Sequence, residues 1–350
     1  MFSVITTIQT PTPSVLTLVD RLGQIGSPLI AIGDKKGPAS FEVPHARFFS
    51  IQDQSKLALT LASSLPVGHY ARKNLGYLIA IGEGADCIYE TDDDNAPNSA
   101  WRPRTLQAVV RKVAARKWVN VYRMFSSENI WPRGFPLELI TDPATYHMNG
   151  TQGMENVECP VQQGLANLAP DVDAVWRLAL DREFSFNDGP SIWLPEGSWC
   201  PFNSQTTWWW PVAYPLLYLP SYCSFRMTDI WRSFVAQRCL WAMGYGLVFH
   251  APEVDQQRNL HNLLRDFEDE VSGYLQNQKI VNALEATSLQ PGAEHVAGNL
   301  RVCYEALVTL GVIPVKELAL VDNWLEDVAA VLKLGAEEKK PALAARTAVA

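Results

Sequence analysis

Residues 72–95 read RKNLGYLIAIGEGADCIYETDDDN, and this stretch decides the class of the fold. Apolar residues recur at three- and four-residue steps over 71–84, which predicts a helix that ends near Gly84. The segment 87–89 follows as a short strand, and three aspartates come directly after it. A helix that leads into a strand, with polar residues at the carboxyl end of that strand, is typical of an α/β sheet.

The segments upstream of this stretch alternate in the same way. The patterns predict strands at 4–8, 29–32 and 48–49, helices at 15–22 and 53–64, and a turn at 33–38. The sequence therefore predicts a doubly wound α/β sheet over roughly residues 1–125. Ligands of such sheets bind beyond the carboxyl ends of the strands, so Asp34 and the run Asp92–Asp94 are expected to face one crevice.

The pattern of apolar residues is irregular from about residue 126 to 225, and after that it is mainly helical. Residues 126–225 are rich in Pro, Gly and Trp, and we expect loops there apart from a short helix at 171–180. A helix at 229–243, a strand at 245–249 and helices at 255–276, 295–310 and 316–334 are predicted after them. The helix at 255–276 places one apolar stripe along its length: Leu260, Leu263, Leu264, Phe267, Val271, Tyr274 and Leu275.

Charge and hydropathy exclude several classes of protein. Lys plus Arg is 29 and Asp plus Glu is 37, so the net charge is 29 − 37 = −8, which disfavours nucleic acid as a partner. No stretch approaches the roughly 18 apolar residues of a membrane span, and the first residues, MFSVITTIQTPTP, lack the regions of a signal peptide. We therefore expect a soluble, cytoplasmic protein with no membrane span.

The aspartates at 92–94 are the strongest chemical signal. Adjacent carboxylates raise one another's pKa and oppose folding unless a cation compensates them. Mg²⁺ or Mn²⁺ would do so, and two carboxylates with open metal positions can hold a diphosphate through the ion. A solvated acidic loop is the alternative.

The basic run Arg72-Lys73-Asn74, at the start of the preceding helix, is either an anion site or an ordinary solvated helix end.

These residues resemble a known family. The stretch 72–95 is similar to the corresponding part of the STELLO-type glycosyltransferase domain. The resemblance continues in order through WPRGFPLE (131–138), DVDAVWRL (171–178), PFNSQTT (201–207), TDIWRSFVAQRCLW (228–241) and HNLLRDFEDE (261–270). A weaker similarity, confined to the N-terminal half, is to the reversibly glycosylated polypeptides that act as UDP-arabinopyranose mutases.

The resemblance implies a fold and an organisation. The fold would be GT-A, the Rossmann-like fold of nucleotide-diphospho-sugar transferases, with a helical C-terminal part. Residues 1–250 would form the transferase domain, with a nucleotide-sugar-binding half at 1–125 and an acceptor half at 126–250. A helical extension at 251–335 and a tail at 336–350 would follow.

The resemblance also implies a metal-dependent transfer of a sugar from a nucleotide-diphosphate donor, with a UDP-sugar favoured, to a hydroxyl of a glycan or another acceptor. Asp92 and Asp94 would be the DXD carboxylates that bind Mn²⁺ or Mg²⁺ and the donor diphosphate, and Asp93 could substitute for either. Residues expected to bind the donor are Thr6, Asp34 and Lys35 at the nucleoside, and Arg72 and Asn74 near the phosphates. His250 could supply a third metal ligand, although a structural histidine at a strand end is the alternative.

Inversion at the sugar would require a carboxylate that removes the acceptor proton. Asp229 is the first choice because it opens the helix at 229–243, where inverting GT-A enzymes set their base; an ordinary helix cap is the alternative reading. Glu138 and Asp173 are further choices, and a retaining enzyme would need no such base. Candidates for the acceptor surface are Trp131, Arg133, Asn203, Trp208, Trp209 and Arg232.

Two other functions remain open at this point. A nucleotide-sugar mutase would interconvert ring forms of the donor without an acceptor. A scaffold that kept the sheet but lost the chemistry would need neither donor nor metal.

Overall fold

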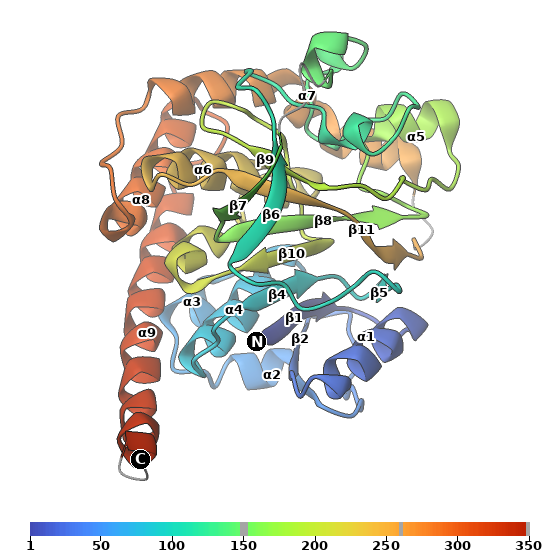
Figure 1. Cartoon of the computed structure of the whole chain (residues 1–350). Helices are drawn as coiled ribbons and strands as arrows, with labels where there is room; N and C mark the ends of the chain where they lie inside the picture. The colour runs from blue at the N-terminus through green and yellow to red at the C-terminus, as the bar shows by residue number, and fades with distance from the viewer. Residues whose placement is uncertain (148–152, 259–261, 348–350) are drawn as a thin grey trace.

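The computed structural model describes residues 1–147, 153–258 and 262–347, with side chains described up to residue 334. One mixed sheet runs through the molecule in the order β3-β2-β1-β4-β10-β8-β11-β9-β6-β7, and β5 pairs with β11 beside this path. Figure 1 shows this sheet at the centre, with α1 and α4 beside its N-terminal strands and α6, α7 and α8 at the other end. The predicted α/β fold class, a Rossmann-like half joined to a helical C-terminal part, is confirmed.

The N-terminal half is the predicted doubly wound unit. Its parallel strands are β1 (Phe2–Thr7), β2 (Leu29–Gly33), β3 (Ala46–Phe49) and β4 (Ile88–Thr91), and its main helices are α1 (Pro13–Gln24) and α4 (Lys73–Gly82). Successive strand residues face opposite sides, so Ile5 packs with α1 and Val4 packs with α4. Gly76 lets α4 approach closely, since a Cβ there would lie 2.5 Å from Cγ1 of Val4.

The helix predicted at 53–64 is wrong as one element. It is divided into α2 (Ile51–Gln54) and α3 (Thr60–Ser64). Ser50 and Asp53 form a capping box that starts α2 early. The carboxylate of Asp327 accepts hydrogen bonds from the backbone of Thr60 and Leu61, at 2.9 and 2.8 Å, and so caps α3 from a helix far away in the sequence.

The loops expected over 126–225 are the main error in the fold. The sheet continues there through β7 (Met154–Glu158), β8 (Val161–Asn167), β9 (Ser191–Leu194) and β10 (Thr206–Trp209), together with β5 (Asn95–Pro97), β6 (Gln107–Lys112) and β11 (Leu247–Gln256). Strand β10 lies antiparallel to β4 and joins the two halves of the sheet. Short 3₁₀ turns connect these strands and the helices: η1 (Tyr70–Arg72), η2 (Val121–Met124), η3 (Leu137–Leu139), η4 (Pro143–Thr145), η5 (Pro211–Leu217), η6 (Phe225–Met227) and η7 (Ala293–His295).

Each of the five helices predicted in the second half is present. They are α5 (Ala174–Leu180), α6 (Thr228–Ala242), α7 (Leu263–Ala286), α8 (Val296–Thr309) and α9 (Glu317–Thr347). However, α7 begins and ends later than the predicted 255–276, and α9 continues into the predicted tail at 336–350. The start of the helix predicted at 255 is wrong, because 255 and 256 belong to β11 and α7 begins at Leu263. The boundary predicted between 250 and 251 falls inside β11, and the division into 1–250 and 251–335 stays a prediction. Helix α9 runs along one side of the molecule and packs against α3 and α4 (Figure 1).

The apolar stripe predicted for α7 lies on its outer side. Leu264 and Leu275 are 70% and 62% exposed, and Leu260 lies outside the described residues. The buried side of α7 is polar in its first half, where Asp266 and Glu270 pair with arginines. In its second half the buried side is apolar and consists of Ile280, Val281 and Leu284. Ion pairs and apolar packing together fix which face of α7 turns inward.

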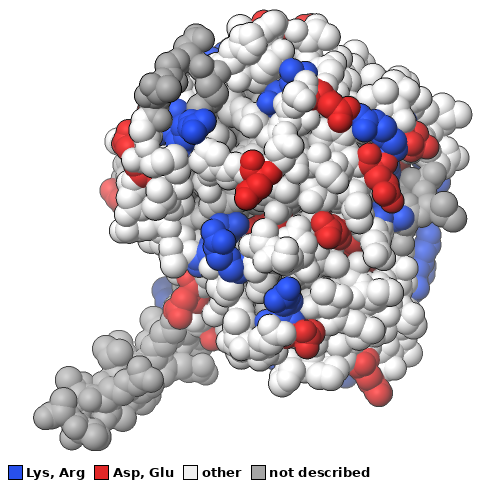
Figure 2. Space-filling model, turned by 45° about the vertical axis from the view of Figure 1, so that its right-hand side comes forward, with Lys and Arg blue, Asp and Glu red and all other residues white. Residues whose placement is uncertain are grey.

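The surface drawn in Figure 2 carries Lys and Arg interspersed with Asp and Glu rather than a broad field of one sign. Among the described residues, no helix has both the length and the apolar character needed to cross a bilayer.

Candidate active site

A pocket of about 630 Å³ opens at the carboxyl ends of β1, β2 and β4. This volume lies in the usual range for small-molecule sites. One wall, which we call the acidic wall, consists of Asp34, Asp92, Asp93 and Asp94. The other, which we call the arginine wall, consists of Arg133, Arg177, Arg226 and Arg258, with Asp171 and Asp229 between them. The structure therefore places the predicted crevice residues Asp34 and Asp92–Asp94 together.

The first two aspartates of the run are held by specific donors. Asp92 Oδ1 accepts hydrogen bonds from Lys73 Nζ at 2.8 Å and from the Tyr70 hydroxyl at 2.7 Å. Lys73, at the start of α4, is fully buried and also donates to the carbonyl of Thr91 at 2.6 Å, so it ties the end of β4 to α4. Asp93 Oδ2 accepts from the Thr7 hydroxyl at 2.6 Å.

Asp94 is the least compensated member of the run. Its Oδ2 accepts from Gln256 Nε2 at 2.9 Å, whereas its Oδ1 is buried and has no hydrogen-bond partner among the described residues. Burial raises the pKa of Asp94 to about 7, and the neighbouring Asp92 and Asp93 add to this rise. Burial also raises the pKa of Asp92 and of Asp93. The run is therefore only partly compensated by Lys73, and burial favours the protonated form of all three carboxyl groups.

The carboxylates of the acidic wall could hold a divalent metal only together with ligands from a substrate or water. Within residues 1–147, 153–258 and 262–347, no three or more His, Cys, Asp or Glu side chains form a group that could hold a metal. Mg²⁺ sites in phosphate-handling proteins commonly use one or two carboxylates and fill the remaining positions with phosphate and water. Asp94 Oδ1 and the side chain of Asp92, which is 26% exposed, offer oxygen ligands of this kind.

The third ligand predicted at His250 has no place in this site. His250 is buried in β11, and it is absent from the pocket lining. Its Nδ1 and Nε2 lie 2.7 Å from the Ser191 hydroxyl and 2.9 Å from Gln162 Oε1. Both ring nitrogens are thus used within the sheet, and the structural reading of His250 is the one that the geometry supports. The residue that β11 brings to the acidic wall is Gln256.

The predicted donor-binding residues are only partly brought together. Thr6, Asp34 and Arg72 line the pocket. Asp34 accepts from the backbone N–H groups of Gly68 and His69, at 2.6 and 2.7 Å, so it also anchors the loop before α4.

Two of the predicted donor-binding residues do not line the pocket. Lys35 is exposed outside it, and its neighbour Lys36 contributes to the lining instead. Asn74 is buried beneath the pocket, where its side chain donates to and accepts from the backbone of Leu219, both at 2.9 Å. The residue of the basic run that contacts the aspartates is Lys73.

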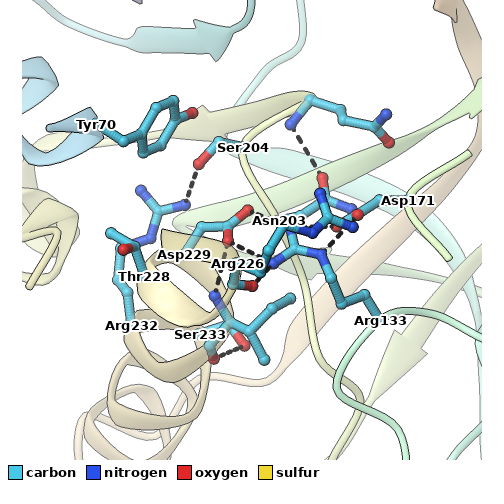
Figure 3. A network of polar contacts seen from close by, with 12 residues as sticks. Tyr70, Arg133, Asp171, Asn203, Ser204, Arg226, Thr228, Asp229, Arg232 and Ser233 are labelled. Carbon is cyan, nitrogen blue, oxygen red and sulfur yellow. Dashed lines mark hydrogen bonds and ion pairs between the residues drawn. The ribbon is translucent and has the colours of Figure 1, made fainter. Parts of the chain in front are cut away.

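Asp229 lines the pocket but is tightly paired, as Figure 3 shows. Arg133 donates from Nη1 and Nη2 to the two carboxylate oxygens of Asp229, each at 3.0 Å, and from Nε and Nη2 to Asp171, each at 2.8 Å. Burial acts to raise the pKa of Asp229, but the Arg133 guanidinium outweighs it and the pKa lies below its ordinary value. The carboxylate therefore stays ionised, and Arg133 occupies both of its oxygens.

The two alternative bases lie elsewhere. Glu138 is exposed in η3, outside the pocket. Asp173 is fully buried and caps α5, where its oxygens accept from the backbone of Trp176 at 2.8 Å and from Trp131 Nε1 at 2.7 Å. Neither side chain belongs to the pocket lining.

Asp173 predicts a pH dependence of stability. Burial raises its pKa from 3.8 to about 7, so the folded protein binds a proton that the unfolded chain releases between these values. This contribution to the free energy of unfolding is full below about pH 4 and is lost as pH rises to about 7. In Asp173→Asn, which keeps a capping oxygen, the fall in stability from pH 5 to pH 8 should be about 2 kcal/mol smaller than in the wild type. Urea unfolding at both pH values measures it, and equal falls would contradict the assignment.

Most of the predicted acceptor surface is core. Trp208, Trp209 and Arg232 are at most 1% exposed, and Trp131 and Asn203 are also buried. Arg133 alone of these six candidates lines the pocket. The tryptophans pack within and against the sheet, so their number reflects core packing.

Sequence reasoning named Arg133 but missed the other three arginines of the arginine wall and Gln256. Arg177 is on α5, Arg226 is in η6, and Gln256 and Arg258 lie at and just after the end of β11. The sequence analysis predicted a helix from 255, whereas Gln256 ends a strand and Arg258 follows it. A strand end at this point is the signal that would have placed both residues at the pocket.

Comparisons with known proteins agree with the sequence resemblance. Residues 226–336 match the family model of STELLO glycosyltransferases. The chain is 29% identical over 251 residues to probable glycosyltransferase STELLO2 of Arabidopsis thaliana, an alignment that covers 65% of this chain and 32% of that protein. It is 28% identical over 274 residues to probable glycosyltransferase STELLO1, which covers 71% and 34%. The resemblance to STELLO-type domains is confirmed, and the chain spans about a third of the length of these relatives.

A solved structure, the glucosyl-3-phosphoglycerate synthase of M. tuberculosis, is similar at 12% identity with a TM-score of 0.36. That match covers 79% of this chain and 80% of the other.

Proposed function

We propose that this chain is a metal-dependent glycosyltransferase that moves a sugar from a nucleotide-diphosphate donor, with a UDP-sugar favoured, to a hydroxyl acceptor. The observation that carries the proposal is the run Asp92–Asp94, which lines a pocket at the end of β4 and leaves Asp94 Oδ1 buried without a partner. The similarity to STELLO glycosyltransferases supports the reaction class.

Each part of the acidic wall has a role in this proposal. Asp92 and Asp94 would hold Mn²⁺ or Mg²⁺, which would bind the donor diphosphate and offset the charge that builds on the leaving group. Lys73 and Tyr70 orient Asp92 through its Oδ1. Thr6 and Asp34, at the ends of β1 and β2, line the part of the pocket where we place the nucleoside.

We propose inversion with Asp229 as the base, and the pairing of Asp229 sets a condition on this role. A carboxylate with a lowered pKa is a weak base, so an acceptor hydroxyl would have to replace one N–H of Arg133 as its partner. Asp229→Asn is then expected to lower kcat by about 10²–10⁴-fold, the usual contribution of a general base. The anomeric configuration of the product, determined by NMR, is the second measurement. A retained configuration would remove Asp229 from the reaction and leave it as the partner of Arg133.

The donor class is tested by binding. Isothermal titration of UDP, GDP and their sugars, with and without Mn²⁺, should give binding that depends on the metal. Absence of binding by any nucleotide in the presence of Mn²⁺ would contradict the proposal. The same donors incubated without an acceptor separate the alternatives, because a mutase would form an isomeric nucleotide sugar and a scaffold would leave the donor unchanged and unbound.

A further inference from the structure

Arg177 is a buried guanidinium that lacks a carboxylate partner. It extends from α5, is 6% exposed and lines the pocket. Its Nη2 donates to the carbonyl of Pro170 at 2.6 Å, whereas its Nε is buried and has no hydrogen-bond partner in the described part of the chain. No ion pair involving Arg177 is present among the described side chains.

The other members of the arginine wall use the nearby carboxylates. Arg133 pairs with Asp171 and Asp229. Arg226 pairs with Glu270 at 2.8 Å, and Arg258 pairs with Asp266 at 2.7 Å. Arg177 therefore faces the pocket without a carboxylate of its own.

The pKa of Arg177 agrees with its lack of an ion-pair partner. Burial, and then the Arg258 charge, lowers the pKa of Arg177 to about 10, although the Asp171 and Asp181 carboxylates act in the opposite direction. The guanidinium is still charged at neutral pH, and it lies near the charges of Arg258 and Arg226. A buried charge without a paired carboxylate is costly, and an anion bound in the pocket would recover part of that cost.

We infer that the arginine wall binds an anionic group, a phosphate or a carboxylate, that the acceptor carries. This inference deepens the proposed function and rests on it. An anionic acceptor would be oriented by Arg177, with Arg226 and Arg258 near it, while its hydroxyl is directed toward the donor at the acidic wall. Planar guanidinium groups bind phosphate and carboxylate through paired hydrogen bonds, which fixes orientation as well as affinity.

The acceptor is a better source of this anion than the donor diphosphate. The cation that lowers the pKa of Asp92 and of Asp93 most strongly is Lys73, and not an arginine of the arginine wall. In the proposed function the diphosphate is bound by the metal that Asp92 and Asp94 would hold, and no arginine of the arginine wall forms an ion pair with either carboxylate among the described residues. The arginine wall is then free for a second anionic group.

The experiment compares the wild type with Arg177→Gln and with a matched control, Arg182→Gln. Arg182 lies just after α5, is about half exposed and pairs with Glu128 outside the pocket, so both variants lose one positive charge. Inorganic phosphate is titrated into each protein without metal, and binding is measured by calorimetry. We expect phosphate binding to be at least tenfold weaker in Arg177→Gln and within twofold of wild type in Arg182→Gln. Equal phosphate binding in all three proteins would overturn the inference.

Two further arms identify the source of the anion. Binding of UDP with Mn²⁺ should stay within twofold in Arg177→Gln, and UDP-glucuronic acid should lose no more affinity than UDP-glucose. A tenfold loss for UDP would assign the wall to the donor diphosphate, and a selective loss for UDP-glucuronic acid would assign it to the transferred sugar. Either result would overturn the inference.

A last variant separates this inference from the proposed function. Asp94→Asn should lose the binding of UDP with Mn²⁺ and keep phosphate binding, since Asp94 lies on the acidic wall. Phosphate binding that persists without any nucleotide binding in the wild type would contradict the donor proposal and leave the anion site intact. Nucleotide binding without phosphate binding would contradict the anion site alone.

Discussion

Asp94→Asn is expected to stabilise the metal-free protein and at the same time to abolish its binding of Mn²⁺ and nucleotide. Burial and the charges of Asp92 and Asp93 raise the pKa of Asp94 to about 7, so its ionised form destabilises the fold at pH 8. Asparagine keeps an oxygen for Gln256 and removes the charge, but it buries an N–H₂ group in place of Oδ1. The net gain in the free energy of unfolding should be about 1–3 kcal/mol.

Loss of the ligand oxygen should weaken binding of UDP with Mn²⁺ by at least about 10²-fold, because a metal contributes several kcal/mol to charge stabilisation. Chemical unfolding at pH 8 without metal and calorimetry with Mn²⁺ and UDP measure the two effects. Asp20→Asn, an exposed change of the same charge on α1, is the control and should alter neither. An Asp94→Asn protein that is less stable than wild type, or that binds UDP with Mn²⁺ normally, would refute the metal site.

The Asp92–Asp94 part of the acidic wall could be predicted because its signal is local. A helix over 71–84, a strand at 87–89 and three carboxylates after it lie within one stretch, and the structure keeps them in this order as α4, β4 and the end of β4. One residue of this stretch could not be predicted. Helix periodicity does not say which residue of Arg72-Lys73-Asn74 faces the end of the strand, and in the structure it is Lys73 that contacts Asp92.

The strand predicted at 245–249 is present as the first part of β11. The other strands of the second half of the sheet could not be predicted, because several are short or carry unusual side chains. Strand β10 is formed by Thr206–Trp209, and it is identified as a strand only through its pairing with β4 and β8. Strand β8 contains Gln162 and Gln163, which are buried and bonded to distant groups such as His250 and Asn203. A sequence with polar residues in a central strand is easily predicted to be a loop, because the hydrogen-bond partners of those residues are distant in the sequence. Three members of the arginine wall, Arg177, Arg226 and Arg258, were missed for a related reason, because they come from α5, η6 and the segment after β11.

Strand β4 contains one carboxylate of a buried ion pair, so Arg232→Met should strongly destabilise the fold. Glu90 is fully buried in β4, and Arg232 Nη1 donates to its Oε1 at 2.8 Å. Burial acts to raise the pKa of Glu90, but Arg232 and Lys73 outweigh it and keep the carboxylate ionised. Removing Arg232 leaves a buried charge with reduced compensation and should lower the free energy of unfolding by about 3–5 kcal/mol.

The double variant Arg232→Met/Glu90→Gln should recover at least about half of that loss, because the uncompensated charge is then gone. Arg238→Met, on the same helix, is the control: its guanidinium donates only to the carbonyls of Leu284 and Thr287, and its loss should cost about 1–2 kcal/mol. Urea unfolding of the four proteins measures these differences.

The effect of Arg232→Met should extend to the site. Lys73 Nζ lies 3.9 Å from Glu90 Oε1 and 2.8 Å from Asp92 Oδ1, so it is shared between the two carboxylates. Without Arg232, Glu90 would draw Lys73 away from Asp92, and the affinity for UDP with Mn²⁺ should fall in the folded variant and return in the double variant. If the single variant is destabilised but binds UDP with Mn²⁺ as tightly as the wild type, Lys73 does not link the core of the sheet to the acidic wall.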